Sequence, residues 1–129
     1  MPSRTASPKV FLADDSPVIR ERVNALLAEA DIAVVGEAAT PQGCISGILA
    51  SHPDVVVLDV QLEGGSGLEV LQAVRRAEPG IAFVVFSNNV EPAYRKRYLG
   101  EGAACFLDKS ADANELLPAV ATACQRPVH

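Results

Sequence analysis

The chain has 129 residues, 49% of them hydrophobic and 21% charged, which suits one domain with its own hydrophobic core. A net charge of −5 argues against nonspecific binding to nucleic acid or to an anionic membrane surface. No apolar run approaches the roughly 20 residues of a membrane span, and we expect no secretory leader. The widely spaced cysteines, in apolar surroundings, predict free buried thiols in a reducing cytoplasm: Cys44, Cys105 and Cys124.

Residues 1–8 are polar and punctuated by proline, which predicts a disordered lead-in. The domain is predicted over residues 9–125, followed by a tail at 126–129. Within it, continuous apolar runs typical of buried strands alternate with amphipathic stretches typical of helices. Such alternation predicts an α/β fold with a parallel sheet and helices on both faces. The five predicted strands are 9–13, 32–38, 55–59, 81–86 and 103–107.

The connections between these strands carry recognisable helix and turn signals. Ser16-Pro17 and Thr40-Pro41 each place a capping side chain before a proline at the first helical position. His52-Pro53 is expected to end the second helix. Residues 60–67 are predicted to be a glycine-rich loop, since glycine permits left-handed backbone. Pro118 is expected to kink the last helix, because it removes a backbone hydrogen bond.

Polar side chains stand where four of the predicted strands end. Asp14 and Asp15 follow the first strand, Asp59 ends the third, Ser87 follows the fourth, and Lys109 comes shortly after the fifth. In a doubly wound parallel sheet these strand ends lie on one edge, where such folds bind their ligands. We therefore expect three carboxylates, one hydroxyl and one ammonium to converge there.

Converging carboxylates need a counter-charge. Two of them about 5 Å apart repel by roughly 3 kcal/mol at an effective dielectric constant of about 20. Mg²⁺ prefers carboxylate and carbonyl oxygens, so the cluster predicts a magnesium site. A carboxylate beside Mg²⁺ can attack phosphorus and become an aspartyl phosphate. The cation and Lys109 would neutralise the transferring group, and Ser87 would donate a hydrogen bond to it.

From about residue 9 to residue 124 the chain resembles the receiver domain of two-component response regulators. The resemblance implies a flavodoxin-like doubly wound sheet of five parallel strands in the order 2-1-3-4-5. The residues that match the family pattern, in order and spacing, are Asp14, Asp15, Asp59, Ser87, Phe106 (as the switch aromatic) and Lys109.

The family implies a function for each matching residue. Asp59 would accept a phosphoryl group from a sensor histidine kinase or a phosphotransfer protein. Asp15, Asp59 and the Gln61 carbonyl would bind Mg²⁺ directly, and Asp14 would act mainly through water. Ser87 and Lys109 would bind the phosphoryl oxygens. Ser87 and Phe106 would form the switch.

The resemblance also bears on activity and partners. We expect an autocatalytic phosphoacceptor with slow self-dephosphorylation rather than an enzyme acting on a separate substrate. The fourth helix, fifth strand and fifth helix would form a face for a homodimer or an effector. Arg95, Lys96 and Arg97 lie in that fourth helix, and a solvated helix face is their default interpretation. We expect no membrane association and no DNA binding by this chain alone.

Three positions depart from the family pattern. Glu63 and Ser110 stand where the family usually has proline, and Asn88 stands where it usually has a small residue. A cis Lys109–Ser110 peptide would cost about 3 kcal/mol, so we expect a trans bond. Phe106 has no hydroxyl to satisfy when buried. We therefore expect a shallow switch, with the inward rotamer populated without phosphate.

Three other functions would need different residues at these positions, and an aspartyl-nucleophile phosphatase is the main alternative. A haloacid-dehalogenase-like phosphatase, which also uses an aspartyl nucleophile, wants Asp-x-Asp after its first strand, whereas Asp14 and Asp15 are adjacent. A flavin-binding module would need a phosphate-binding loop where this chain carries acids that repel phosphate. The complete acidic set argues against a degenerate receiver that is never phosphorylated.

Overall fold

The computed structural model describes residues 8–124, which form a parallel sheet in the order β2-β1-β3-β6-β7. These five strands are the predicted ones to within two residues at their ends, and when they are numbered along the chain their order across the sheet is the predicted 2-1-3-4-5. The predicted lead-in and tail lie outside the described residues, except for Pro8, whose carbonyl accepts a hydrogen bond from the Ala33 amide. The strands are β1 (Lys9–Ala13), β2 (Ala33–Ala38), β3 (Val55–Leu58), β6 (Ala82–Ser87) and β7 (Cys105–Asp108).

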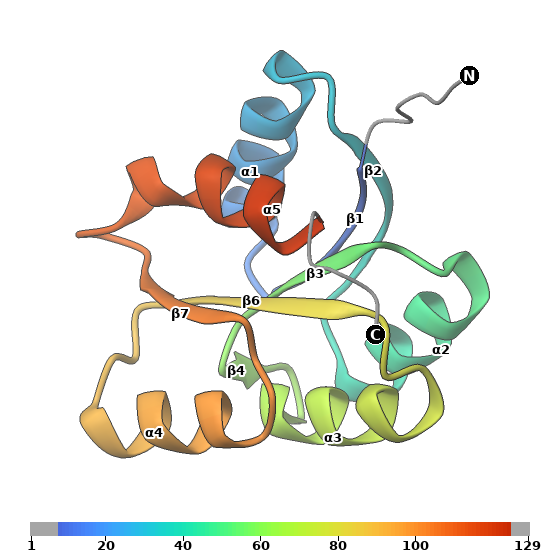
Figure 1. Cartoon of the computed structure of the whole chain (residues 1–129), viewed down its shortest axis with the longest axis vertical. Coiled ribbons are helices and arrows are strands. Elements are labelled where there is room, and N and C mark those ends of the chain that lie inside the picture. The colour runs from blue at the N-terminus through green and yellow to red at the C-terminus, as the bar shows by residue number, and fades with distance from the viewer. Residues whose placement is uncertain (1–7, 125–129) are drawn as a thin grey trace.

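Helices cover both faces of this sheet (Figure 1). One face carries α1 (Pro17–Glu29) and α5 (Leu116–Cys124), and the other carries α2 (Pro41–Ser51), α3 (Gly67–Ala77) and α4 (Pro92–Gly100). The Ser16 hydroxyl accepts a bond from the Ile19 amide at 3.2 Å, so the predicted cap of α1 is confirmed. The Thr40 cap and the end of α2 at His52 are confirmed as well.

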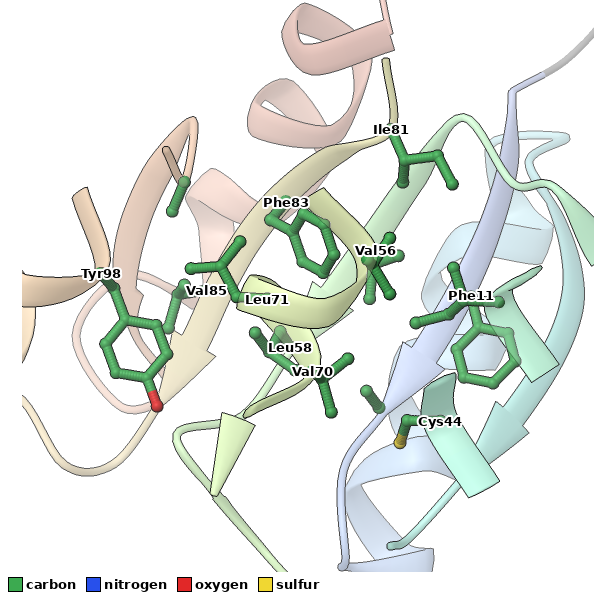
Figure 2. Close-up of a cluster of buried hydrophobic side chains, with 14 of the residues drawn as sticks. Phe11, Cys44, Val56, Leu58, Val70, Leu71, Ile81, Phe83, Val85 and Tyr98 are labelled. Atoms are coloured by element: carbon green, nitrogen blue, oxygen red, sulfur yellow. The ribbon is translucent and has the colours of Figure 1, made fainter. Parts of the chain in front are cut away.

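The core consists of two apolar layers, one on each side of the sheet. Figure 2 shows the layer under α2, α3 and α4, where the rings of Phe11 and Phe83 lie among aliphatic side chains. The opposite layer joins β1, β3 and β6 to Leu27 of α1 and Val120 of α5. Because β3 and β6 are covered on both sides, every one of their residues is buried. This rigid centre fixes the ends of the strands relative to one another.

Two segments differ from the sequence-based prediction. Residues 60–67 include a short antiparallel pair, β4 (Gln61–Leu62) with β5 (Gly65–Ser66), and only Gly64 in this stretch has a positive φ, of 81°. The last helix is preceded by a 3-10 turn, η1 (Ala113–Glu115), so Pro118 is the third residue of α5. In the first turn of a helix its missing N–H has no intrahelical partner, so the expected interior kink was wrong.

The peptide bonds and the helix lengths bear on two further expectations. Residues 8–124 contain no cis peptide bond, which confirms the trans Lys109–Ser110 bond. No helix among residues 8–124 has the length and apolar character needed to cross a bilayer.

Candidate functional site

The predicted polar residues meet at the carboxyl end of the sheet. Asp14 and Asp15 lie just beyond β1 and Asp59 just beyond β3, and one oxygen from each carboxylate lies within 4.8 Å of the others. Neighbouring backbone bonds fix two of the three. The Asp59 amide donates to the Ala13 carbonyl at 2.9 Å, and the Asp14 amide donates to the Ala38 carbonyl at 3.2 Å. The convergence expected from the fold is therefore present.

Lys109 lies between two of these acids. Its Nζ is 2.7 Å from Asp14 Oδ2 and 3.0 Å from Asp59 Oδ2, and its side chain is only 7% exposed. Burial acts to lower the pKa of Lys109, but the bonds to the two carboxylates outweigh it and raise that pKa. Burial raises the pKa of Asp14, against the opposing effect of Lys109. The ammonium is therefore charged at neutral pH and bridges the acids.

The donor set fits a hard divalent cation. Three carboxylates and one ammonium carry two net negative charges when all are ionised, in a site where Asp14 and Asp59 are buried. Asp15 is exposed, so the open side of the cluster faces solvent. Mg²⁺ takes one or two carboxylates and keeps several waters, which matches a cluster buried on one side and open on the other. These residues thus offer an acidic pocket compatible with metal binding.

The remaining predicted residues surround the acids. Ser87 ends β6 and is buried, and its hydroxyl accepts a hydrogen bond from the Asn89 amide at 3.0 Å. Gln61 begins β4, and its amide lies 3.5 Å from Asp59 Oδ1. That the Gln61 carbonyl binds the metal stays a prediction.

Phe106 is turned inward, with 3% of its surface exposed. Its ring meets Tyr98 of α4 edge to face, with centroids 6.1 Å apart. The guanidinium of Arg95 lies over the Phe106 ring, 5.2 Å from its centroid. Arg95 therefore does more than solvate the helix surface, although Lys96 and Arg97 beside it are exposed as expected.

Two residues that touch the site were missed by sequence reasoning. Arg20 of α1 donates from Nη1 to the Asp14 carbonyl at 2.6 Å. The Tyr98 hydroxyl donates to the carbonyl of Val60, the residue after Asp59, at 3.4 Å. Arg20 lies in the first turn of the helix that follows the acidic pair, which is a weak indication of its role. Nothing in the sequence distinguishes Tyr98 from Tyr94.

The chain belongs to the response regulator receiver domain family, whose model matches residues 10–121. It is therefore a receiver domain of the kind found in response regulators of two-component systems. The predicted family and fold are confirmed. The comparisons give no support to the phosphatase alternative.

Individual relatives agree with this assignment. The chain is 32% identical to the response regulator GacA of Pseudomonas aeruginosa over 113 residues, which cover 87% of this chain and 53% of GacA. It is 37% identical to the probable transcriptional regulatory protein NarL of Mycobacterium tuberculosis, and the match covers 87% of this chain and 52% of NarL. The solved signal receiver domain of that NarL superposes with a TM-score of 0.86 at 34% identity, covering 95% of this chain and 100% of the other. The chain spans about half the length of the curated relatives it matches.

Proposed function

We propose that Asp59 takes a phosphoryl group from the phosphohistidine of a sensor histidine kinase or a phosphotransfer protein. The observation that carries this proposal is that one oxygen of the Asp59 carboxylate has almost no hydrogen bonding. Both oxygens of Asp14 are bonded, one to the Ser16 amide at 2.9 Å and one to Lys109. Within residues 8–124, Asp59 Oδ1 has only the 3.5 Å contact with the Gln61 amide. Of the buried carboxylate oxygens in the cluster, Asp59 Oδ1 is therefore the most available to act as a nucleophile.

The proposed transfer uses the three carboxylates, the Lys109 ammonium and the Ser87 hydroxyl. An Asp59 oxygen attacks phosphorus, the P–N bond to the donor imidazole breaks, and the imidazole nitrogen keeps the electron pair. Bound Mg²⁺, held by Asp15 and Asp59 with Asp14 acting mainly through water, would supply positive charge to the phosphoryl oxygens. Lys109 donates to the same oxygens. The Ser87 hydroxyl already accepts from Asn89, so its own proton is free to be donated.

The test is phosphorylation by a small donor. Incubation of the wild-type protein with acetyl phosphate and Mg²⁺ should add one phosphoryl mass, and Asp59→Asn should not gain it. Asp54→Asn is the matched control, because Asp54 precedes β3 at the opposite edge of the sheet and its change alters the charge equally. A wild-type rate in Asp59→Asn would refute the assignment.

We propose that the switch is shallow. Phe106 is already buried against Tyr98 and covered by Arg95, as expected for a ring without a hydroxyl to satisfy. A phosphoryl group can shift the equilibrium only through its differential contacts, here with Ser87 and Lys109. Those contacts are worth about 1.5–3 kcal/mol each. Small NMR shifts at Phe106 on phosphorylation would agree, and a large rearrangement of the ring would contradict the proposal.

We propose α4, β7 and α5 as the output face, for an effector or a second copy of the chain. The support is that Phe106 lies in β7 and contacts α4, so a change at Ser87 reaches this face through neighbouring strands β6 and β7. Sedimentation of the protein with and without acetyl phosphate would detect a second copy. We expect no DNA binding by this chain alone, because of its net charge of −5.

We further propose that the acyl phosphate decays by slow self-hydrolysis and that the protein works in the cytoplasm. The thiols of Cys44, Cys105 and Cys124 are free, which suits a reducing compartment. Cys44 is buried as predicted, but Cys105 and Cys124 are only partly buried, so the prediction of burial was wrong for those two. The decay is measured by mass spectrometry after the donor is removed. A phosphorylated form that persists as long as in denatured protein would contradict self-hydrolysis.

A further inference from the structure

Arg20 connects three elements at the edge of the acidic cluster. It lies in the first turn of α1, and its side chain is 18% exposed. Its Nη1 donates to the backbone carbonyl of Asp14 at 2.6 Å, and its Nε donates to Glu37 Oε1 at 2.8 Å, near the end of β2. One guanidinium therefore ties the loop after β1 to the neighbouring strand β2.

The bond to the Asp14 carbonyl fixes a particular peptide unit. That carbonyl and the amide of Asp15 belong to the same planar group, so holding the oxygen holds the plane. The orientation of the plane determines where the Asp15 side chain leaves the backbone. Among residues 8–124, no hydrogen bond or ion pair holds the Asp15 carboxylate itself. Its direction depends on the backbone that carries it.

We propose that Arg20 and Glu37 form a clamp that orients the Asp14–Asp15 peptide and so sets the affinity of the cluster for Mg²⁺. Arg20 is a positioning residue, and Glu37 acts only through it by holding the guanidinium in place. This inference rests on the proposed function, because it assigns Asp15 as a direct metal ligand. Loss of an outer partner of a metal ligand typically weakens binding about 10–100-fold. We expect about tenfold here, because the clamp acts through the backbone.

The sign of the effect separates positioning from simple charge. Arg20 is a cation close to a cation site, so removing its charge alone would tighten Mg²⁺ binding. Removing the clamp would weaken it. Lysine is not an equivalent replacement, since one ammonium lacks the planar fork that reaches two partners at fixed angles.

The experiment measures Mg²⁺ affinity by NMR titration in wild type, Arg20→Ala and the double variant Arg20→Ala/Glu37→Ala. The double variant leaves the net charge unchanged. Positioning predicts about tenfold weaker binding in both, because Glu37 has no effect without Arg20. Wild-type affinity in the double variant would overturn the clamp, as would equal or tighter binding in Arg20→Ala. Arg22→Ala, an exposed arginine of the same helix, is the matched charge control and should not weaken binding.

The rate of phosphorylation is a second readout on the same variants. The rate of phosphorylation by acetyl phosphate should fall in Arg20→Ala at limiting Mg²⁺ and recover at saturating Mg²⁺, because the chemistry at Asp59 is untouched. No recovery would overturn a role confined to the metal. If Arg20→Ala does not fold, Arg20→Lys carries the test. Weaker binding in that variant supports the clamp, and wild-type binding overturns it.

A measurement on the metal-free protein distinguishes a failure of the clamp from a failure of the proposed metal site. The backbone amide of Asp15 should shift in the NMR spectrum of Arg20→Ala without Mg²⁺, because its own peptide carbonyl loses a charge-assisted bond. An unchanged Asp15 amide overturns the clamp even where Mg²⁺ binds normally. A wild-type protein that binds no Mg²⁺ at this loop would refute the proposed metal site, while the amide shift would still report the orientation of the peptide.

Discussion

The first residue of α3, Gly67, lies against the backbone carbonyl of Asp59 so closely that a Cβ at Gly67 would overlap that oxygen. The Gly67 amide also donates to the Val60 carbonyl at 2.7 Å. The start of the helix thus braces the backbone that carries the proposed phosphoacceptor. Because the obstacle is backbone rather than a flexible side chain, a methyl group can be accommodated only if α3 or the loop moves.

Gly67→Ala should therefore destabilise the protein and slow its phosphorylation. Overpacking of this kind costs about 1–3 kcal/mol in the free energy of unfolding, measured by urea denaturation. Gly100→Ala is the control, because nothing lies within 4 Å of a Cβ at that last residue of α4. It should be neutral or up to about 1 kcal/mol more stable. Equal behaviour of the two variants would show that the close contact is unimportant.

Tyr98 should make stability depend on pH in the alkaline range. Burial raises the pKa of its phenol to about 12 from an ordinary value near 10. Between those values the folded protein binds more protons than the unfolded chain, so the free energy of unfolding falls as pH rises. Two pKa units correspond to at most about 2–3 kcal/mol.

The comparison of wild type with Tyr98→Phe isolates this effect from other groups. At neutral pH the variant should lose about 0.5–1 kcal/mol with the hydrogen bond to Val60. Above about pH 10 that deficit should shrink or reverse, because the variant has no phenol to ionise. Urea denaturation at neutral and alkaline pH measures it. Tyr94→Phe, on the exposed side of α4, should follow the wild type throughout. A constant difference between wild type and Tyr98→Phe would contradict the prediction.

Asp14 should act in the acidic range, in metal-free buffer with EDTA. Burial raises the pKa of Asp14, although its bond to Lys109 opposes this. As pH falls through the folded pKa towards the unfolded value, the folded state takes up the proton first, so this carboxyl adds to stability. As the pH is lowered from neutral to about 4, the free energy of unfolding of the wild type should therefore increase relative to that of Asp14→Asn. A relative loss over the same range would reverse the sign assigned to this group.

Mg²⁺ should stabilise the folded protein through the acidic cluster. A ligand present at about ten times its dissociation constant adds about 1.4 kcal/mol to the free energy of unfolding. Asp15→Ala should lose this gain, since Asp15 is the proposed ligand that faces solvent. Glu29→Ala, which removes an exposed charge at the far end of α1, should keep it. Urea denaturation with Mg²⁺ or EDTA compares them, and a full Mg²⁺ effect in Asp15→Ala would refute the ligand assignment.

The central strands and the meeting of their polar ends were predictable because burial and topology determine them. A run such as residues 55–58 has no polar face, so it predicts a strand covered on both sides. Asp14, Asp59 and Lys109 then converge whatever their side-chain details. The bond from Arg20 to Asp14 was not predictable, because it depends on how far one side chain reaches across the strand ends. The β4–β5 pair is too short to show an alternating pattern.

Tyr94 and Tyr98 illustrate the same limit within one helix. The sequence of α4 has no continuous apolar stripe, so it does not indicate which tyrosine faces the core. Tyr98 is buried because it lies opposite Phe106, and Tyr94 is 38% exposed. That distinction comes from the position of β7 at the edge of the sheet.

Lys109 lies between Asp14 and Asp59 and supplies a positive charge that is covalently attached to the chain, where the proposed metal ion would supply a diffusible one. In the absence of magnesium, Lys109 neutralises part of the negative charge of the acidic cluster and so reduces the repulsion between the carboxylates. If Mg²⁺ binds as proposed, it would compete for the carboxylates with an ammonium that cannot diffuse away. Under the proposed chemistry, the readiness of this receiver to accept a signal would therefore track the free magnesium of its surroundings as well as the activity of its kinase.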